Sequence, residues 1–284
     1  MPPLMKRALI SARLRLDRVV VPPRNRRLEA AFAADPQAWL ARVDAAIDRG
    51  VAWIAPQRDV SMSVLLCAQR TLQRTGDSRF GYVVPQLERY VATLRDPATR
   101  VVLPGYDPAD PRHAHLPDVM EVRPYHPVEL LMLDAVWAGV RAQPDILQRL
   151  VAFDDEGFYG TTHIIVGGLV LLMNGGAPAD RVRAAIEATL PAILARNATS
   201  PRADDIFAER IMVLQWIDRH ALIPPSWILR LLDAQRPDGG WASWNMPPVG
   251  LSNQHTVAVA LAALAEFLAA RRGHLRPGWG VPGP

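Results

Sequence analysis

The sequence has almost no cysteine and almost no lysine. Cys67 is the only cysteine among 284 residues, so an intrachain disulfide, a four-thiolate zinc site and a cysteine-ligated iron–sulfur cluster are excluded. Lys6 is the only lysine, and the formal net charge of +4 therefore comes from arginine. A chain of this length can bury a sizeable core without covalent cross-links. With a single thiol, a reducing cytoplasm is the expected location.

Long apolar runs and sustained strand-like alternation are also missing. No segment reaches the ~18 apolar residues that a membrane-spanning helix needs, and no apolar core of a signal peptide follows the N-terminus. Basic residues gather only within residues 1–30, which we interpret as a solvated, partly flexible arm. Aromatic residues do not interleave with these basic residues, so the pattern does not favour nucleic-acid binding.

What is present is a succession of helical patterns separated by proline- and glycine-rich loops. They predict one all-α domain over residues 31–284, interrupted by a long proline-rich loop over residues 95–127. Segments that are apolar on nearly every face alternate with amphipathic ones, which predicts an (α/α) toroid of about five to six helical hairpins around an apolar pocket. The predicted helices are 35–48, 59–75, 82–94, 126–141, 144–153, 161–173, 178–196, 204–220, 225–235 and 253–272.

A repeat marks the starts of the buried helices. Asp155–Phe158 with His163, and Asp238–Trp241 with His255, both place an aspartate, a glycine and an aromatic residue before a histidine. Leucines follow six and nine residues after each histidine. Weaker copies begin three more helices with a polar residue. The five residues that we expect at one end of the channel are Asp59, His126, His163, Asp205 and His255.

The turn of the second copy carries a family resemblance. Arg230–Gln235, followed by Gly239, Gly240 and Trp241, resembles the QW repeat of squalene-hopene and oxidosqualene cyclases. The β subunits of protein prenyltransferases repeat a similar turn on the same toroid. The resemblance implies the toroid, but a fold hosts many reactions. The Asp-x-Asp-Asp and Asp-Asp-x-x-Asp motifs of terpene cyclases and synthases are missing here.

The resemblance to prenyltransferase β subunits also implies a zinc-binding histidine near the start of an inner helix, which His163 or His255 could match. Glu129 lies three residues after His126, and Glu209 lies four residues after Asp205, so each pair shares a helix face. Histidines and carboxylates together predict a site for a divalent transition metal, either Zn, Fe, Mn or Cu. The predicted metal ligands are His126, His163, His255 and Glu129.

Our leading hypothesis is an enzyme that uses this metal on a small, largely hydrophobic substrate. The alternative is a metal-independent, terpenoid-cyclase-like or lyase-like enzyme in which the same histidines perform acid–base chemistry. A third hypothesis is a toroid that binds a lipid or a peptide without catalysis. The candidate catalytic residues are Asp59, Asp154, Asp155, Tyr159, Asp205 and Glu209, and the candidate pocket-lining residues are Phe158, Trp241 and Trp244.

Overall fold

The chain is all-α, as the sequence predicts, over the residues that the computed structural model describes: 3–58, 60–93, 145–153, 159–174, 177–243 and 250–278. These ranges contain no strand, and the one isolated bridge joins Ala242 to Ser252. The helices, with the 3-10 helices written η, are α1 (Pro3–Ala34), α2 (Pro36–Ile54), α3 (Met62–Thr75), η1 (Ser78–Tyr82), α4 (Val83–Thr93), α6 (Ile146–Ala152), α7 (Gly160–Asn174), α8 (Ala179–Thr199), α9 (Asp205–Trp216), η4 (His220–Leu222), α10 (Pro225–Ala234) and α11 (Gln254–Arg271).

Side-chain caps explain why several helices begin where the sequence predicts. The Asp35 carboxylate accepts from Ala38 N at 3.0 Å at the start of α2, and Pro36 takes the first helical position. Asp204 caps α9 through Phe207 N at 3.3 Å. Asn253 caps α11 through the backbone N–H of His255 at 2.9 Å. The predicted helix 126–141 and the predicted loop 95–127 lie outside the described residues.

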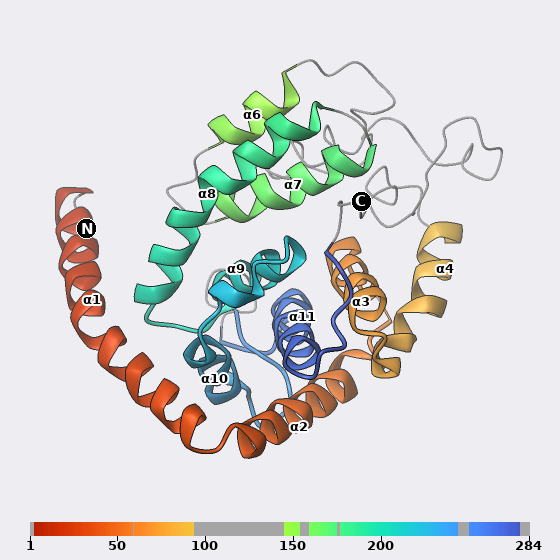
Figure 1. Ribbon diagram of the computed structural model, residues 1–284, viewed down its shortest axis with the longest axis horizontal. Helices are drawn as coiled ribbons and strands as arrows, with labels where there is room; N and C mark the ends of the chain where they lie inside the picture. The colour runs from red at the N-terminus through yellow and green to blue at the C-terminus, as the bar shows by residue number, and fades with distance from the viewer. Residues whose placement is uncertain are drawn as a thin grey trace.

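Helix α11 is the centre of the molecule (Figure 1). Its residues from Thr256 to Ala269 are all buried, and it packs against α9, α3 and α2. Contacts at both ends show that α3, α9 and α11 run in the same direction. His255 meets α3 and α9 at its N-terminal end, and Glu266 meets Arg74 of α3 and Trp216 of α9 near the other end. A helix that is apolar on every face requires this kind of enclosure.

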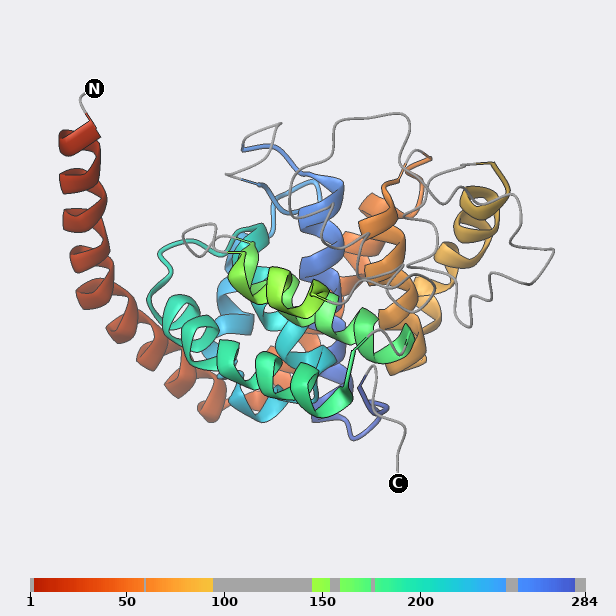
Figure 2. The same cartoon turned by 90° about the horizontal axis from the view of Figure 1, so that it is seen from above.

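Helix α7 departs from that common direction. Figures 1 and 2 show it lying across the direction of α11, with α8 packed along it. Its first turn lies beside α9, where His163 approaches Glu209. Its last turn lies beside α3, where Met173 Sδ is 3.7 Å from a guanidinium nitrogen of Arg70. The helices that carry polar residues at their starts are therefore adjacent, but they do not all run in parallel.

The basic arm predicted over residues 1–30 falls within one long helix, α1, which continues through Pro22 and Pro23. Its first half stands away from the body (Figure 2), and its second half packs against α8 and α10. Val21 and Phe32 are buried there, so apolar contacts stabilise this half of the helix.

The QW-like turn has a structural role in joining neighbouring hairpins. The Gln235 amide donates to Ala46 O of α2 at 2.8 Å and to Gly239 O at 2.9 Å. Gly239 has a φ of +90°, and a Cβ there would lie 2.6 Å from the Arg49 carbonyl oxygen. Trp241 is buried, and its indole N–H donates to Leu231 O at 2.8 Å. The turn thus ties the α10–α11 hairpin to α2.

Candidate functional site

The first turn of α7 fixes the orientation of His163. The carbonyl oxygen of Tyr159 accepts hydrogen bonds from His163 N at 2.9 Å and from Thr162 Oγ1 at 2.9 Å. The same oxygen lies 2.9 Å from His163 Nδ1. A carbonyl oxygen can only accept, so Nδ1 carries the hydrogen, and Nε2 is the basic nitrogen of the neutral ring. The Tyr159 and His163 rings meet edge to face, with centroids 5.8 Å apart.

Helix α9 supplies two buried carboxylates on one face. Asp205 and Glu209 are four residues apart, and both are almost fully buried. Asp205 accepts a short hydrogen bond from the Tyr159 hydroxyl, and its other oxygen lies 3.5 Å from Ser243 Oγ. Asp205 therefore ties the segment before α7 to the segment before α11.

Glu209 lies between two imidazole rings that come from two other helices. Its Oε1 is 3.6 Å from His163 Nδ1 of α7, and its Oε2 is 3.6 Å from His255 Nε2 of α11. The side chain of Glu209 is 4% exposed, whereas those of His163 and His255 are 23% and 24% exposed. The remaining ring nitrogen of His255, Nδ1, is 3.3 Å from Ser63 Oγ of α3. We call Ser63, Tyr159, His163, Asp205, Glu209 and His255 the histidine cluster.

The charges of the cluster shift the pKa values of its members. Burial raises the pKa of a carboxyl group, but at Glu209 the interactions with His255 and His163 outweigh burial and hold the pKa below its ordinary value. Burial lowers the pKa of His255, but Glu209 and Asp205 outweigh it, and the pKa lies above the ordinary 6.5. Burial, together with the charge of Asp205, raises the pKa of Tyr159, which keeps its proton and donates it.

This arrangement suits proton transfer. An ionised carboxylate that is withdrawn from water faces two partly accessible imidazoles, whose ordinary pKa lies close to neutral pH. The carboxylate faces both rings and stabilises the protonated form of His255. The Tyr159 hydroxyl and Asp205 form a second polar pair beside the first.

The fit of the cluster to the metal expected from the sequence is partial. His163 Nδ1 binds a carbonyl oxygen, so only Nε2 of that ring could hold a metal. Among the described residues, no group of three or more His, Cys, Asp and Glu side chains has the arrangement to hold a metal ion. His126 and Glu129, the other predicted ligands, lie outside the described residues. The metal site stays a prediction.

The structure brings together five of the predicted site residues: Tyr159, His163, Asp205, Glu209 and His255. Trp241, a candidate for the pocket wall, is in the core, where its ring lies close to Gly50 of α2. The other predicted site residues lie outside the described ranges: Asp59, His126, Glu129, Asp154, Asp155, Phe158 and Trp244.

The sequence-based prediction missed Ser63 and Ser243. Ser63 lies in the first turn of α3, four residues after Asp59 in the sequence, and within the predicted helix 59–75 the rule that residues four apart share a face would have pointed to it. Ser243 belongs to the irregular segment after the QW-like turn, and no periodicity marks it. Its contact with Asp205 depends on how that segment folds back.

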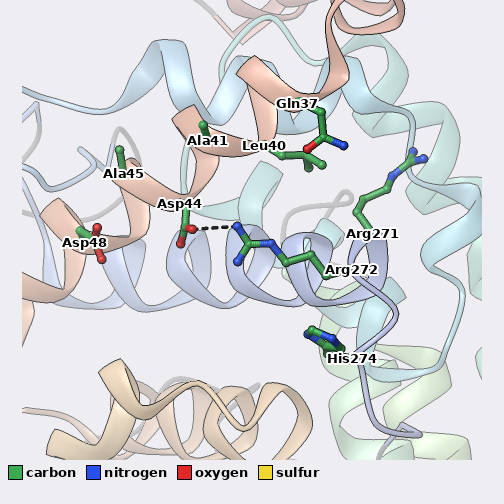
Figure 3. A pocket seen from close by; sticks show the side chains of 9 residues that line it. All are labelled: Gln37, Leu40, Ala41, Asp44, Ala45, Asp48, Arg271, Arg272 and His274. Atoms are coloured by element: carbon green, nitrogen blue, oxygen red, sulfur yellow. Dashed lines mark hydrogen bonds and ion pairs between the residues drawn. The ribbon is translucent and has the colours of Figure 1, made fainter.

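The hollow drawn in Figure 3 lies away from the cluster. It has a volume of about 650 Å³ and lies between α2 and the C-terminal end of α11. Its charged side chains pair with one another or with neighbours. Arg272 binds Asp44 at 2.8 Å, and Arg79 bridges Asp44 and Asp48. We therefore place the candidate site at the histidine cluster and not in this hollow.

Comparison of the chain with known protein families, with curated proteins and with solved structures finds no match. In the part of the chain that the structure describes, none of the helices combines the length and the apolarity needed to cross a bilayer. The case for function therefore depends on the geometry of the cluster.

Proposed function

We propose that this protein is an enzyme that performs acid–base catalysis on a small, largely apolar substrate at the histidine cluster. The observation that carries the proposal is the position of Glu209 between His163 and His255, within 3.6 Å of each ring. In this proposal His163 and His255 transfer protons, and Glu209 faces both rings and favours the charged form of His255. Tyr159, whose hydroxyl donates its only hydrogen to Asp205, fixes the wall beside the substrate.

The proposed setting of the cluster is an (α/α) toroid. In support, α3, α11 and α9 lie side by side in the same direction, with polar residues at their shared N-terminal ends and α2 packed outside α11. The crossing helix α7 supplies the fourth such start. The proposal requires the predicted helix 126–141 to close the ring between α7 and α3. An experimental structure with that segment elsewhere would contradict it.

The enzymatic function is tested by measuring the turnover of a panel of substrates by matched carboxylate variants. The substrates are small apolar esters, epoxides and enolisable ketones, each assayed with chelator and with added Zn²⁺, Mn²⁺ or Fe²⁺. We expect Glu209→Gln to lower turnover about 10²- to 10⁴-fold, as expected when a positioned proton-transfer group is lost. Glu187→Gln is the control, because this exposed carboxylate only pairs with Arg219 at the surface.

Equal turnover by the wild type and Glu209→Gln would overturn the proposal. Turnover that disappears with chelator and returns with one metal would favour the metal site predicted from the sequence. Tight retention of an apolar ligand without turnover of any panel member would favour the binding protein.

A further inference from the structure

A hydroxyl, an imidazole and a carboxylate stand in series within the histidine cluster. Ser63 Oγ is 3.3 Å from His255 Nδ1, and His255 Nε2 is 3.6 Å from Glu209 Oε2. The three residues come from α3, α11 and α9. We propose that Ser63 is a nucleophile activated by His255 and Glu209, and that the enzyme hydrolyses esters of small apolar acids. This inference rests on the proposed acid–base function of the same cluster.

The order of the groups suits activation of the hydroxyl. Glu209 is buried and can only accept, and its Oε2 lies 3.6 Å from His255 Nε2, so activation of Ser63 requires the tautomer with the hydrogen on Nε2. The lone pair of the neutral ring is then on Nδ1, the nitrogen that faces Ser63. A base within reach of a nucleophile, oriented in turn by a third group, is the general signature of nucleophilic catalysis. Contacts of this kind are often long before a substrate binds.

Local structure holds each member in place. Asn253 caps α11 through the backbone N–H groups of His255 and Thr256, so the imidazole projects from a fixed first turn. Glu209 lies within α9, all of whose residues are buried. Ser63 is half-buried in the first turn of α3. Rigid elements of this kind provide the positional accuracy that a catalytic group needs.

The start of α3 also provides a place for negative charge. Ser61 is the N-cap residue, but its side chain does not cap the helix, and its hydroxyl lies 2.9 Å from Ser63 Oγ. The N–H groups of a first helical turn have no partner within the helix, and the helix dipole favours an anion there. An oxyanion that forms on a carbonyl attacked by Ser63 would develop beside these groups.

The reaction balances without any further reactant except water. The Ser63 oxygen bonds to the carbonyl carbon of an ester while its proton passes to His255 Nδ1. The resulting imidazolium, stabilised by Glu209, returns the proton to the leaving alkoxide as the C–O bond breaks, which leaves an acyl-serine. Water then attacks the acyl carbon, His255 takes and returns its proton, and the carboxylic acid leaves with Ser63 restored.

The helices that carry Ser63 and His255 continue into the apolar core. The residues that continue α3 and α11 beyond the cluster are apolar and buried, among them Val64, Leu65, Val257 and Val259. Short apolar acyl esters are therefore the probes of choice.

Covalent labelling tests the nucleophile. The wild type, Ser63→Ala and Ser61→Ala are treated with an alkyl fluorophosphonate, and the adduct is located by peptide mass spectrometry. Hydrolysis of p-nitrophenyl butyrate is followed in parallel. We expect the adduct on Ser63 in the wild type and in Ser61→Ala, with no adduct and at least a ~10²-fold loss of hydrolysis in Ser63→Ala. Ser61→Ala is a matched control because it removes the neighbouring hydroxyl.

An adduct on another residue, no adduct on the wild type, or full hydrolysis by Ser63→Ala would overturn the proposal. Should Ser63→Ala fail to fold, Ser63→Cys provides the second measurement. The new thiol is alkylated with iodoacetamide with and without His255→Ala. A rate that is about 10²-fold lower without His255 supports the relay, and equal rates contradict it.

The two proposals can fail separately. If Glu209→Gln loses turnover of another substrate class while Ser63→Ala keeps it, the assignment of Ser63 as nucleophile fails and the acid–base function stands. If Ser63 is labelled equally fast in Glu209→Gln, Glu209 does not activate the serine, and equal turnover by that variant would show that the acid–base function fails as well.

Discussion

The group formed by α3, α9 and α11 contains a buried carboxylate near each end, and the two carboxylates have opposite environments. Glu266, near the C-terminal ends, accepts from Arg74 Nε at 2.7 Å and from Trp216 Nε1 at 3.0 Å. Glu209, near the N-terminal ends, faces two imidazoles at 3.6 Å, and among the described residues its Oε2 has no partner at hydrogen-bond distance.

The comparison separates a structural network from a reactive one. Both oxygens of Glu266 are used and its partners are buried. Arg74 also donates to Gln215 O at 2.8 Å, and only its Nη1 has no partner among the described residues. Such a closed network holds helices together. The partners of Glu209 are titratable and about a quarter exposed, so protons can enter and leave. Incomplete pairing of a buried carboxylate next to accessible histidines is the pattern expected of a functional site.

The largest effect is expected in the Glu266 network near the C-terminal ends of α3, α9 and α11, which we call the closed end. Arg74→Ala removes the buried cation and leaves Glu266 without its charged partner, which should lower the free energy of unfolding by about 3–5 kcal/mol. Urea denaturation measures this difference. Arg272→Ala is the control, since its ion pair with Asp44 is at the surface and should contribute less than about 1 kcal/mol. Similar losses in the two variants would remove the distinction between the closed network and a surface pair.

The pH dependence of stability should also originate at the closed end. Burial outweighs the ion pair with Arg74 and raises the pKa of Glu266 from its ordinary 4.5 to about 7. Between these values the unfolded chain releases a proton that the folded protein keeps. Stability from this group is therefore complete below pH 4.5 and is lost as the pH rises through 7, by at most about 3 kcal/mol. Urea denaturation from pH 4.5 to 8 measures the slope, and Glu266→Gln should flatten it.

At the other end, which we call the open end and where Glu209 faces His163 and His255, we expect a change in the titration of His255. Glu209 and Asp205 outweigh burial and raise the pKa of His255, so its NMR titration in the wild type should have a midpoint above 6.5. Glu209→Gln removes the nearer negative charge and should lower that midpoint. A base must be neutral to act, so the acidic limb of the activity profile should move to lower pH in the variant. An unchanged midpoint would mean that Glu209 does not charge the ring.

The smallest effect is expected between the two ends, at Cys67. This thiol is buried on α3 with its sulfur 3.6 Å from Met212 Sδ, and burial raises its pKa far above the usual range. The folded protein should react with iodoacetamide at pH 8 at least ~10²-fold more slowly than the urea-unfolded protein. Rapid alkylation of the folded protein would show that the middle of α3 opens to solvent. The same result would complicate the Ser63→Cys experiment.

Much of the secondary structure follows from local patterns in the sequence. The predicted helix 253–272 corresponds to α11 at Gln254–Arg271, and the predicted helix 225–235 corresponds to α10 at Pro225–Ala234. Caps and prolines mark these boundaries within a few residues. The helix predicted over 204–220 ends earlier, at Trp216, because Asp218 adopts a left-handed backbone conformation. The charge pattern of the N-terminal segment did not predict helix α1, whose second half packs against α8 and α10.

Part of the candidate site also follows from the sequence. Equivalent positions in the repeat identified His163, Asp205 and His255 without any structure, because a residue at the start of each buried helix has a defined place along the chain. The sequence alone indicated most of the described helices, which of them are buried, and which begin with a titratable group. Periodicity and capping depend on residues that are close in the sequence, so the sequence itself contains them.

Only the tertiary structure decided how those helices meet. It placed Glu209 between two rings, set Ser63 against the second nitrogen of His255, and turned α7 across its neighbours. It also distinguished Glu266, closed off by Arg74 and Trp216, from Glu209. These pairings join residues between 46 and 192 positions apart in the chain. Packing in three dimensions selects such partners, and no local pattern encodes them.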